Sequence, residues 1–158
     1  MHAPTAANGQ GRTRVSTERI VIVGAGQAAS QLAFSLRQAG HAGPIALIGE
    51  EPYPPYQRPP LSKKFLAGEI DAAKLFFRAG AAYESRGIAL RLGAHAVSID
   101  RAAQTVALES GETLYYDRLA LTTGSVPLRL AVPGADLDGV HVLRTIADAE
   151  AMQRNVPG

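Results

Sequence analysis

The chain has 158 residues, of which 46% are hydrophobic and 19% charged, enough for one domain with a hydrophobic core but short for two. Its net charge of +2 is too small to indicate a nucleic-acid or membrane-surface partner, and no apolar run approaches the ~20 residues that cross a bilayer. Cysteine is absent, which excludes disulfides, thiolate metal sites and cysteine nucleophiles from this stretch and agrees with a cytoplasmic location.

The first 18 residues are rich in alanine, threonine, glycine and asparagine and contain no hydrophobic segment. This composition predicts a disordered tail over 1–18 rather than a secretory signal. A transit peptide is the alternative because arginines and a serine occur here, but Pro4, Gly9 and Gly11 oppose the amphipathic helix that it needs. We expect order to begin at Arg19.

A strand, a helix and a second strand follow one another from Arg19 onward. The β-branched run 20–23 predicts a buried strand of a parallel sheet. From Gln27 the apolar residues repeat at three- and four-residue steps, which predicts a helix that stops at Gly40. The run 45–48 predicts another buried strand. Together these segments form a βαβ unit, the smallest dinucleotide-binding element.

The middle of the chain reads as loops and short elements. Residues 51–60 contain five prolines and cannot form a helix or a central strand. Short helices are expected at 61–66 and 79–86. Alternating apolar residues then predict a small antiparallel meander inserted between the parallel strands, with a hairpin turn at 110–112; its strands are expected at 88–92, 94–99, 105–108 and 113–115.

The last part of the chain returns to buried patterns. The run 119–122 predicts a further strand of the parallel sheet, halted by Thr123 and Gly124. Residues 140–143 are expected to form a last strand, and a helix is expected from Ile146 to Gln153.

The turn after the first strand, Gly24-Ala25-Gly26-Gln27-Ala28-Ala29, fits the pattern G-x-G-x-x-G/A. In this pattern Gly24 permits the tight turn, Gly26 lets the backbone approach a pyrophosphate, and Ala29 keeps the helix close to the strand. The helix N-terminus offers N–H groups and a partial positive charge to phosphates. This turn predicts a dinucleotide site but does not distinguish NAD from FAD.

An acidic residue stands at the position that a dinucleotide site requires. Glu50 ends the second strand, 21 residues after Ala29. A carboxylate there accepts hydrogen bonds from the adenosine ribose and repels a 2′-phosphate, which disfavours NADP at this site.

Two later segments, together with the glycine turn, resemble a known family. Arg58-Pro-Pro-Leu-Ser-Lys-Lys-Phe-Leu66 and Tyr116-Asp-Arg-Leu-Ala-Leu-Thr-Thr-Gly-Ser125 are similar to segments of the FAD-dependent ferredoxin reductases of the rubredoxin, putidaredoxin and biphenyl-dioxygenase type. These proteins belong to the pyridine nucleotide-disulfide oxidoreductase superfamily. The resemblance extends from Arg19 to Met152, with Thr122 as a departure, since the family more often has alanine there.

The resemblance implies an α/β fold. We expect a Rossmann-like FAD-binding domain with a parallel sheet and an inserted antiparallel β-meander, and we expect it to be incomplete. Residues 19–145 would be its N-terminal segment, and 146–158 would begin the connection to an NAD(P)H-binding domain.

The resemblance also implies cofactor-binding roles for residues of several segments: Gly24, Gly26, Ala28, Ala29, Glu50, Arg58, Lys63, Val97, Thr123, Gly124 and Arg144. The glycine turn and Ala28 would line the pyrophosphate, and Val97 would contact adenine through its backbone. Arg58 and Lys63 would face the flavin. Lys63, the expected catalytic residue, would lie beside the isoalloxazine ring and stabilise negative charge on it.

The residues alone leave simpler interpretations open. Lys63 also reads as a solvated lysine, Arg58 as a loop arginine, Arg144 as a surface residue at a helix start, and Val97 as an ordinary strand residue. The four histidines are scattered without ligand spacing, so no metal site is expected.

The implied function is the passage of electrons from NAD(P)H through FAD to a ferredoxin or rubredoxin. Disulfide reductases of this architecture carry their redox cysteines where residues 58–64 stand here, so thiol chemistry is not expected. No second glycine turn for the nicotinamide appears before Gly158, and the later strand whose Gly-Asp pair closes the FAD site in the family is also missing. We therefore expect weak FAD binding and little turnover from this chain alone. The alternative is a non-catalytic dinucleotide-binding module, complete as it stands.

Overall fold

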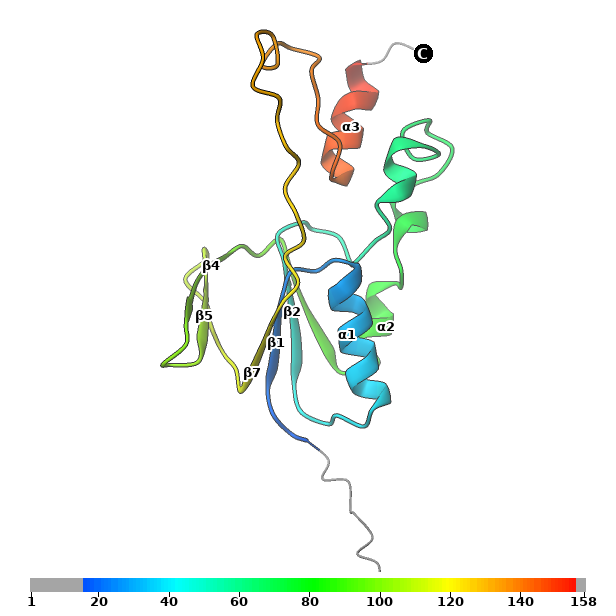
Figure 1. Cartoon of the computed structure of the whole chain (residues 1–158). Coiled ribbons are helices and arrows are strands. Elements are labelled where there is room, and N and C mark those ends of the chain that lie inside the picture. Colours follow the sequence, from blue (N-terminus) through cyan, green and yellow to red (C-terminus); the bar gives the residue numbers. More distant parts are fainter. Residues whose placement is uncertain (1–15, 156–158) are drawn as a thin grey trace, which may run out of the picture.

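The computed structural model describes residues 16–155. Three layers are stacked in its lower part: a three-stranded antiparallel sheet, a four-stranded parallel sheet and a layer of helices (Figure 1). A smaller group of helical turns stands above the upper edge of the parallel sheet. This arrangement confirms the predicted α/β fold with a parallel sheet and a separate antiparallel one.

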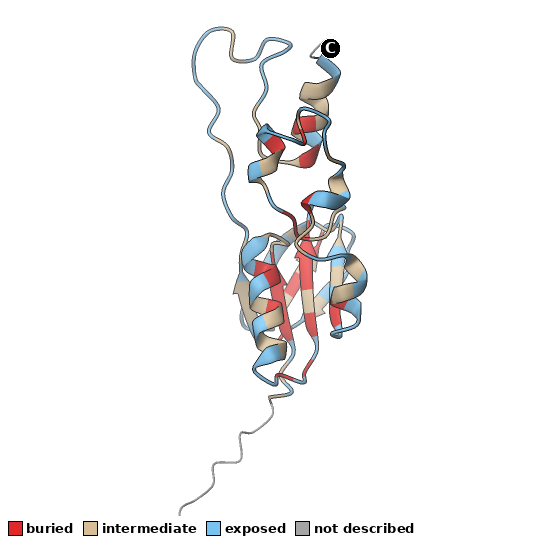
Figure 2. Ribbon diagram, turned by 90° about the vertical axis from the view of Figure 1, so that its right-hand side faces the viewer, coloured by how far each residue is buried: buried red, intermediate tan, exposed pale blue. Residues whose placement is uncertain are grey.

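The parallel sheet comprises β1 (Ile20–Val23), β2 (Ile45–Gly49), β3 (Ile88–Leu92) and β7 (Arg118–Leu121), in the spatial order β3-β2-β1-β7. Every residue of β1 is buried because the strand has a neighbour on each side and a layer on each face. Figure 2 shows this buried centre in red.

Helices α1 (Gln27–Gln38) and α2 (Gly80–Glu84) cover one face of this sheet. The apolar cluster between them and the strands contains Ala29 and Ala33 of α1, Tyr83 of α2, and Ile22 of β1. Small residues at positions 29 and 33 let α1 lie close to the sheet, as predicted for Ala29.

The antiparallel sheet covers the other face. It comprises β4 (Ala96–Asp100), β5 (Thr105–Leu108) and β6 (Thr113–Tyr115), in that order. Val106 and Leu108 of β5 pack with Val21 and Ile48 of the parallel sheet. The hairpin turn at 110–112 is present as predicted, with the Gly111 N–H donating to the Leu108 carbonyl.

The upper group contains the 3₁₀ turns η1 (Pro59–Ser62) and η2 (Ala72–Leu75) and the helix α3 (Ile146–Asn155). They enclose an apolar cluster of their own, whose fully buried members are Leu61, Leu75, Ile146 and Ala149. Gln153 of α3 also donates to the Phe65 carbonyl at 2.6 Å. The helix α3 therefore packs along its length against η1, η2 and the segment that follows η1.

Three sequence-based assignments differ from the structure. Residues 88–92 do not belong to the meander: β3 pairs in parallel with β2. Its apolar residues alternate because β3 is an edge strand with one exposed face. The segment 61–66 is not a helix, since η1 ends at Ser62 and Lys63 leaves the helical conformation at φ −131° and ψ −115°. Residues 140–143 form no strand, because no neighbouring strand of the described chain lies beside them.

The part of the chain that the structure describes begins at Ser16, within the predicted tail. Residues 1–15 lie outside the described residues, but order begins before Arg19. The Ser16 carbonyl accepts hydrogen bonds from the N–H groups of Ala42 and Gly43, and Glu18 forms an ion pair with Arg118 at 2.9 Å. These contacts fasten the chain entering β1 to the neighbouring loop and to β7.

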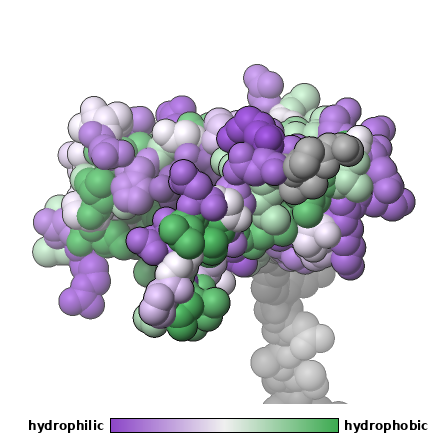
Figure 3. All heavy atoms as spheres, turned by 90° about the horizontal axis from the view of Figure 1, so that it is seen from above, coloured by the Kyte–Doolittle hydropathy of each residue, from purple (hydrophilic) through white to green (hydrophobic). Residues whose placement is uncertain are grey.

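Residues 122–145 connect β7 to α3. They form a long loop, here called the strap, that rises beside the upper group (Figures 1 and 2). Its alternate residues Val126, Leu128, Leu130 and Val132 are 56–90% exposed. Seen from above, apolar side chains lie open on the surface among hydrophilic ones (Figure 3). None of the helices within 16–155 is long and apolar enough to cross a membrane.

Candidate nucleotide-binding site

The carboxyl ends of β1 and β7 lie side by side at the upper edge of the parallel sheet. From β1 the chain proceeds outward to β2 and β3, and it then returns to place β7 on the opposite side of β1. The strand order thus reverses between β1 and β7. In open α/β sheets, ligands bind in the crevice outside the carboxyl ends at such a reversal.

The glycine turn occupies this position. Gly24 adopts φ +102°, a conformation that favours glycine, and a Cβ atom there would collide with the carbonyl of Thr122. Gly26 immediately precedes α1, has no side-chain cap, and nothing lies within 4 Å of where its Cβ would be. The first N–H groups of α1 therefore face open space, as a pyrophosphate requires.

Thr122, the departure from the family pattern, fastens the turn to β7. Its hydroxyl lies 3.1 Å from the Val23 carbonyl and 2.9 Å from the Gly24 carbonyl, and it donates to them. Alanine would lack this bond. Threonine at position 122 therefore provides a contact that holds the glycine turn.

A second glycine lets the turn approach β2. A Cβ atom on Gly49 would collide with the Cβ of Ala25 in the glycine turn. Because Gly49 has no side chain, Ala25 rests directly on the end of β2. The local sequence does not reveal this contact, because it joins the glycine turn to the end of the next strand.

Glu50 projects at the end of β2, one strand away from the glycine turn. Its side chain is 79% exposed, and one carboxylate oxygen lies 3.6 Å from Nδ1 of His95. This places the acid where the adenosine ribose is expected, next to the turn and open to a ligand.

Val97 lies in β4, close to His95 along the chain. The pairing of β4 with β5 shifts between Ala96 and Ser98, so Val97 is a bulge residue without a partner in the ladder. Its side chain is 55% exposed. A bulge leaves backbone groups free to bind something else, which suits the predicted contact of this backbone with adenine.

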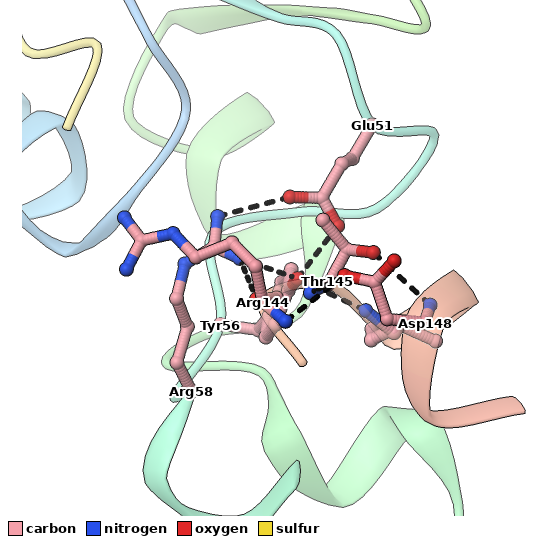
Figure 4. A network of polar contacts seen from close by, with 7 residues as sticks. Glu51, Tyr56, Arg58, Arg144, Thr145 and Asp148 are labelled. Atoms are coloured by element: carbon pink, nitrogen blue, oxygen red, sulfur yellow. Dashed lines mark hydrogen bonds and ion pairs between the residues drawn. The ribbon is translucent and has the colours of Figure 1, made fainter. Parts of the chain in front are cut away.

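Arg58 belongs to a polar network on the proline-rich loop (Figure 4). Its guanidinium forms an ion pair with Glu51 at 3.0 Å, donates to the Tyr56 hydroxyl at 3.1 Å and donates to the Arg144 carbonyl. Three partners thus hold the guanidinium in place.

Arg144 precedes α3, whose start is a reciprocal cap. The Asp148 carboxylate accepts the N–H groups of Arg144 and Thr145 at 2.9 and 2.8 Å, and the Asp148 N–H donates to the Thr145 hydroxyl at 3.1 Å. Burial acts to raise the pKa of Asp148, but the hydrogen bonds from Thr145 and Arg144, together with nearby Arg129, outweigh it and leave this pKa below its usual value.

The Arg144 side chain points away from the network toward the end of β7. A Cβ atom built on Gly124, which adopts φ +76°, would lie 3.1 Å from Nη2 of Arg144. Within residues 16–155 this guanidinium forms no hydrogen bond or ion pair. Thr123 and Gly124 are exposed beside it. The glycine turn, residues 122–124 and Arg144 therefore lie together at the upper edge of the parallel sheet.

Lys63 stands apart from this group. It follows η1, its side chain is exposed, and among the described residues its ammonium group has no hydrogen bond or ion pair. The loop that carries it is nevertheless firmly held, because Leu61 and Phe65 on either side are buried against α3.

Sequence reasoning missed the residues that build this network. The pattern Thr145-x-x-Asp148 is a recognisable cap signature and could have been found. Glu51 and Tyr56 match no motif, and Tyr56 has a partner, Ile146, that lies 90 positions away. No group of three or more His, Cys, Asp or Glu side chains suited to a metal occurs in the described part of the chain.

Comparison with known proteins agrees with this geometry. The sequence profile of the family described as pyridine nucleotide-disulphide oxidoreductase matches residues 18–157. The chain is 46% identical over 144 residues to the probable ferredoxin reductase CtmF of Castellaniella defragrans, which covers 90% of this chain and 35% of that protein. It is 47% identical over 133 residues to the rhodocoxin reductase of Rhodococcus erythropolis, which covers 84% and 31%.

A solved structure has the same fold over this region. The ferredoxin reductase of Rhodopseudomonas palustris matches with a TM-score of 0.81 and 42% identity, over 87% of this chain and 34% of that one. The chain thus spans about a third of the length of the relatives it matches. Since the family profile covers most of the sequence, the chain belongs to the pyridine nucleotide-disulphide oxidoreductase family.

Proposed function

We propose that this chain binds the adenosine diphosphate half of FAD and serves in an NAD(P)H-dependent ferredoxin reductase. The observation that carries the proposal is the meeting of the glycine turn with Glu50 at the carboxyl edge of the sheet, where the strand order reverses. Gly26 supports it most directly, because the space where its Cβ would project is open.

Different segments of the site would hold different parts of the cofactor. Gly24, Gly26 and Ala28 would line the pyrophosphate, while Ala29 keeps the helix in place. Glu50 would accept the ribose hydroxyls, and the unpaired backbone at Val97 would contact adenine. Thr123, Gly124 and Arg144 would close the site on the β7 side.

The proline-rich loop would serve the flavin. Lys63 would lie beside the isoalloxazine ring, where a cation stabilises negative charge on the reduced ring. Arg58 would support it from the same loop. When bound, FAD would supply the conversion between two-electron donation and one-electron transfer.

The relatives' names point to the partners. They are a ferredoxin reductase and a rhodocoxin reductase, so the acceptor proposed here is a small ferredoxin- or rubredoxin-type carrier. NAD(P)H would be the donor, and the cytoplasm, where this donor is available, is the proposed location. The FAD-binding segment would extend over residues 19–145, and residues 146–158 would begin the connection to an NAD(P)H-binding domain.

Titration of the purified 158-residue chain with FAD tests the proposal. We expect saturable binding with one FAD per chain, displaced by ADP but not by an equal concentration of FMN, because the contacts concern the adenosine diphosphate. Flavin fluorescence measures both the binding of FAD and its displacement. A chain that leaves FAD unbound, or that binds FMN as well as FAD, would contradict the proposal.

A further inference from the structure

We propose that Glu51 and Tyr56 are positioning residues that hold the Arg144 guanidinium at the nucleotide site. They would do so by fixing Arg58 and the start of α3. The inference rests on the proposed function, since the group that Arg144 would meet is the negatively charged diphosphate of FAD.

Tyr56 is the centre of the network. The residue is 6% exposed, and its hydroxyl donates to the Glu51 carboxylate at 2.6 Å. The same oxygen accepts the Arg58 guanidinium at 3.1 Å and the Ile146 N–H at 3.3 Å. One hydroxyl therefore links two residues of the proline-rich loop with the first residue of α3 (Figure 4).

Arg58 transmits this link to Arg144. Its Nη2 is held by Glu51, which leaves Nη1 aimed at both the Tyr56 hydroxyl and the Arg144 carbonyl. Its guanidinium also lies over the Tyr56 ring, 5.1 Å from the centroid. Because Glu51 pairs its charge and fixes its orientation, the Arg58 guanidinium holds the Arg144 carbonyl in place.

The backbone of Arg144 is thereby held at both of its polar groups. Its carbonyl accepts Arg58, and its N–H donates to Asp148. Its side chain has no such partner within 16–155 and reaches the neighbourhood of Gly124. A fixed backbone with a free guanidinium beside the glycine turn suits a charge-assisted contact to phosphate.

The hydroxyl at the centre remains a donor over a wide pH range. Burial raises the pKa of Tyr56 above its ordinary value, and the hydrogen bond to Glu51 raises it further. The bond from Tyr56 to Glu51 therefore persists wherever the protein is folded near neutral pH.

Tyr56→Phe tests the inference, with Tyr53→Phe as its matched control. Both remove one hydroxyl from the same loop, but the Tyr53 hydroxyl makes no hydrogen bond in the described part of the chain. We expect Tyr56→Phe and Glu51→Gln to weaken FAD binding by about tenfold, the loss typical of one charge-assisted contact. Tyr53→Phe should leave the FAD dissociation constant unchanged.

A double-mutant cycle separates positioning from general stability. In the Arg144→Ala background, Tyr56→Phe should cause no further loss of FAD affinity, because the group that Tyr56 positions is already gone. If Tyr56→Phe leaves affinity unchanged in the wild-type chain, or multiplies the loss by its full factor in the Arg144→Ala background, the inference is wrong.

The same measurements distinguish this inference from the proposed function. A wild-type chain that binds FAD, together with a Tyr56→Phe variant that binds it equally well, overturns the inference alone. A wild-type chain that does not bind FAD overturns both. Thermal unfolding of each variant without FAD identifies a fold defect, and Glu51→Gln provides the second variant if Tyr56→Phe unfolds.

Discussion

At the scale of single residues, the two glycines of the turn have different tasks. Gly24 is needed for the fold, because it combines a positive φ with close contact to Thr122. Gly26 has neither constraint, with φ −94° and open space around its Cβ position. Its task therefore concerns what approaches from outside.

This difference predicts opposite behaviour for two matched variants. Gly24→Ala should lower the free energy of unfolding by about 2 kcal/mol or more, as expected for a strained backbone and a steric clash. Gly26→Ala should leave stability nearly unchanged and weaken FAD binding, since the methyl group occupies the approach of the diphosphate. Urea unfolding and FAD titration of both variants measure this, and equal stability losses would refute the assignment.

Tyr56 also predicts a stability change at alkaline pH. Its pKa in the folded chain is raised from the ordinary 10.0 by burial and by Glu51, so the unfolded chain loses this proton first as the pH rises. The free energy of unfolding should therefore fall from about pH 10 upward. Tyr56→Phe should reduce the slope of this fall in urea unfolding between pH 9 and 11, and an unchanged slope would count against the network.

At the scale of elements, the start of α3 depends on its cap. Thr145 and Asp148 together satisfy N–H groups that the helix cannot pair internally. Because Ile146 and Ala149 are buried in the upper apolar cluster, fraying of this end would also loosen the packing on the proline-rich loop.

Removal of the cap carboxylate gives an acid-side prediction. Asp148→Asn should destabilise the chain by about 1 kcal/mol at pH 7, the usual value of a cap. Because the folded pKa of Asp148 lies below 3.8, its contribution is present above that value and disappears as the pH falls further. The difference between wild type and variant should therefore shrink as the pH falls below 3.8, measured by urea unfolding from pH 7 to pH 2. The exposed Asp136→Asn is the control, and a constant difference would contradict the cap.

The elements also indicate what a sequence can predict. The strands β1 and β2 and the helix α1 were predicted because their apolar periods reflect full burial or one buried face. The strand β7 is present as predicted but is not buried, because it lies at the edge of the sheet and its residues are exposed or half-buried. β3 was assigned to the wrong sheet because an edge strand of a parallel sheet alternates like an antiparallel one. Residues 140–143 have a strand composition but no strand beside them.

The candidate site shows the same limit. The glycine turn and Glu50 were found because their spacing is local and follows from the βαβ unit. The roles of Gly49 and Tyr56 depend on contacts with the distant residues Ala25 and Ile146, which no local pattern encodes. Glu51 pairs with its neighbours Tyr56 and Arg58, but no motif marks it.

At the scale of the whole molecule, the strap between β7 and α3 exposes unusual apolar surface. Val126 and Leu128 are both 90% exposed, and the alternation of residues 126–132 presents several apolar side chains together. Exposed apolar segments of this length promote association between molecules.

We therefore expect the 158-residue chain to self-associate as its concentration rises. Leu128→Ser combined with Leu130→Ser should reduce this association without changing FAD affinity, since neither residue belongs to the proposed site. Light scattering across a concentration series measures it. Equal association of wild type and variant would show that the strap is not responsible.

In the proposed site, Glu50 accepts the adenosine ribose beside the glycine turn. The direct measurement is the FAD dissociation constant of Glu50→Ala, with the exposed loop variant Glu69→Ala as a charge-matched control. Loss of hydrogen bonds to an ionised carboxylate should weaken binding by roughly 10- to 100-fold, while the melting temperature without FAD stays unchanged. An unchanged dissociation constant in Glu50→Ala would contradict the account.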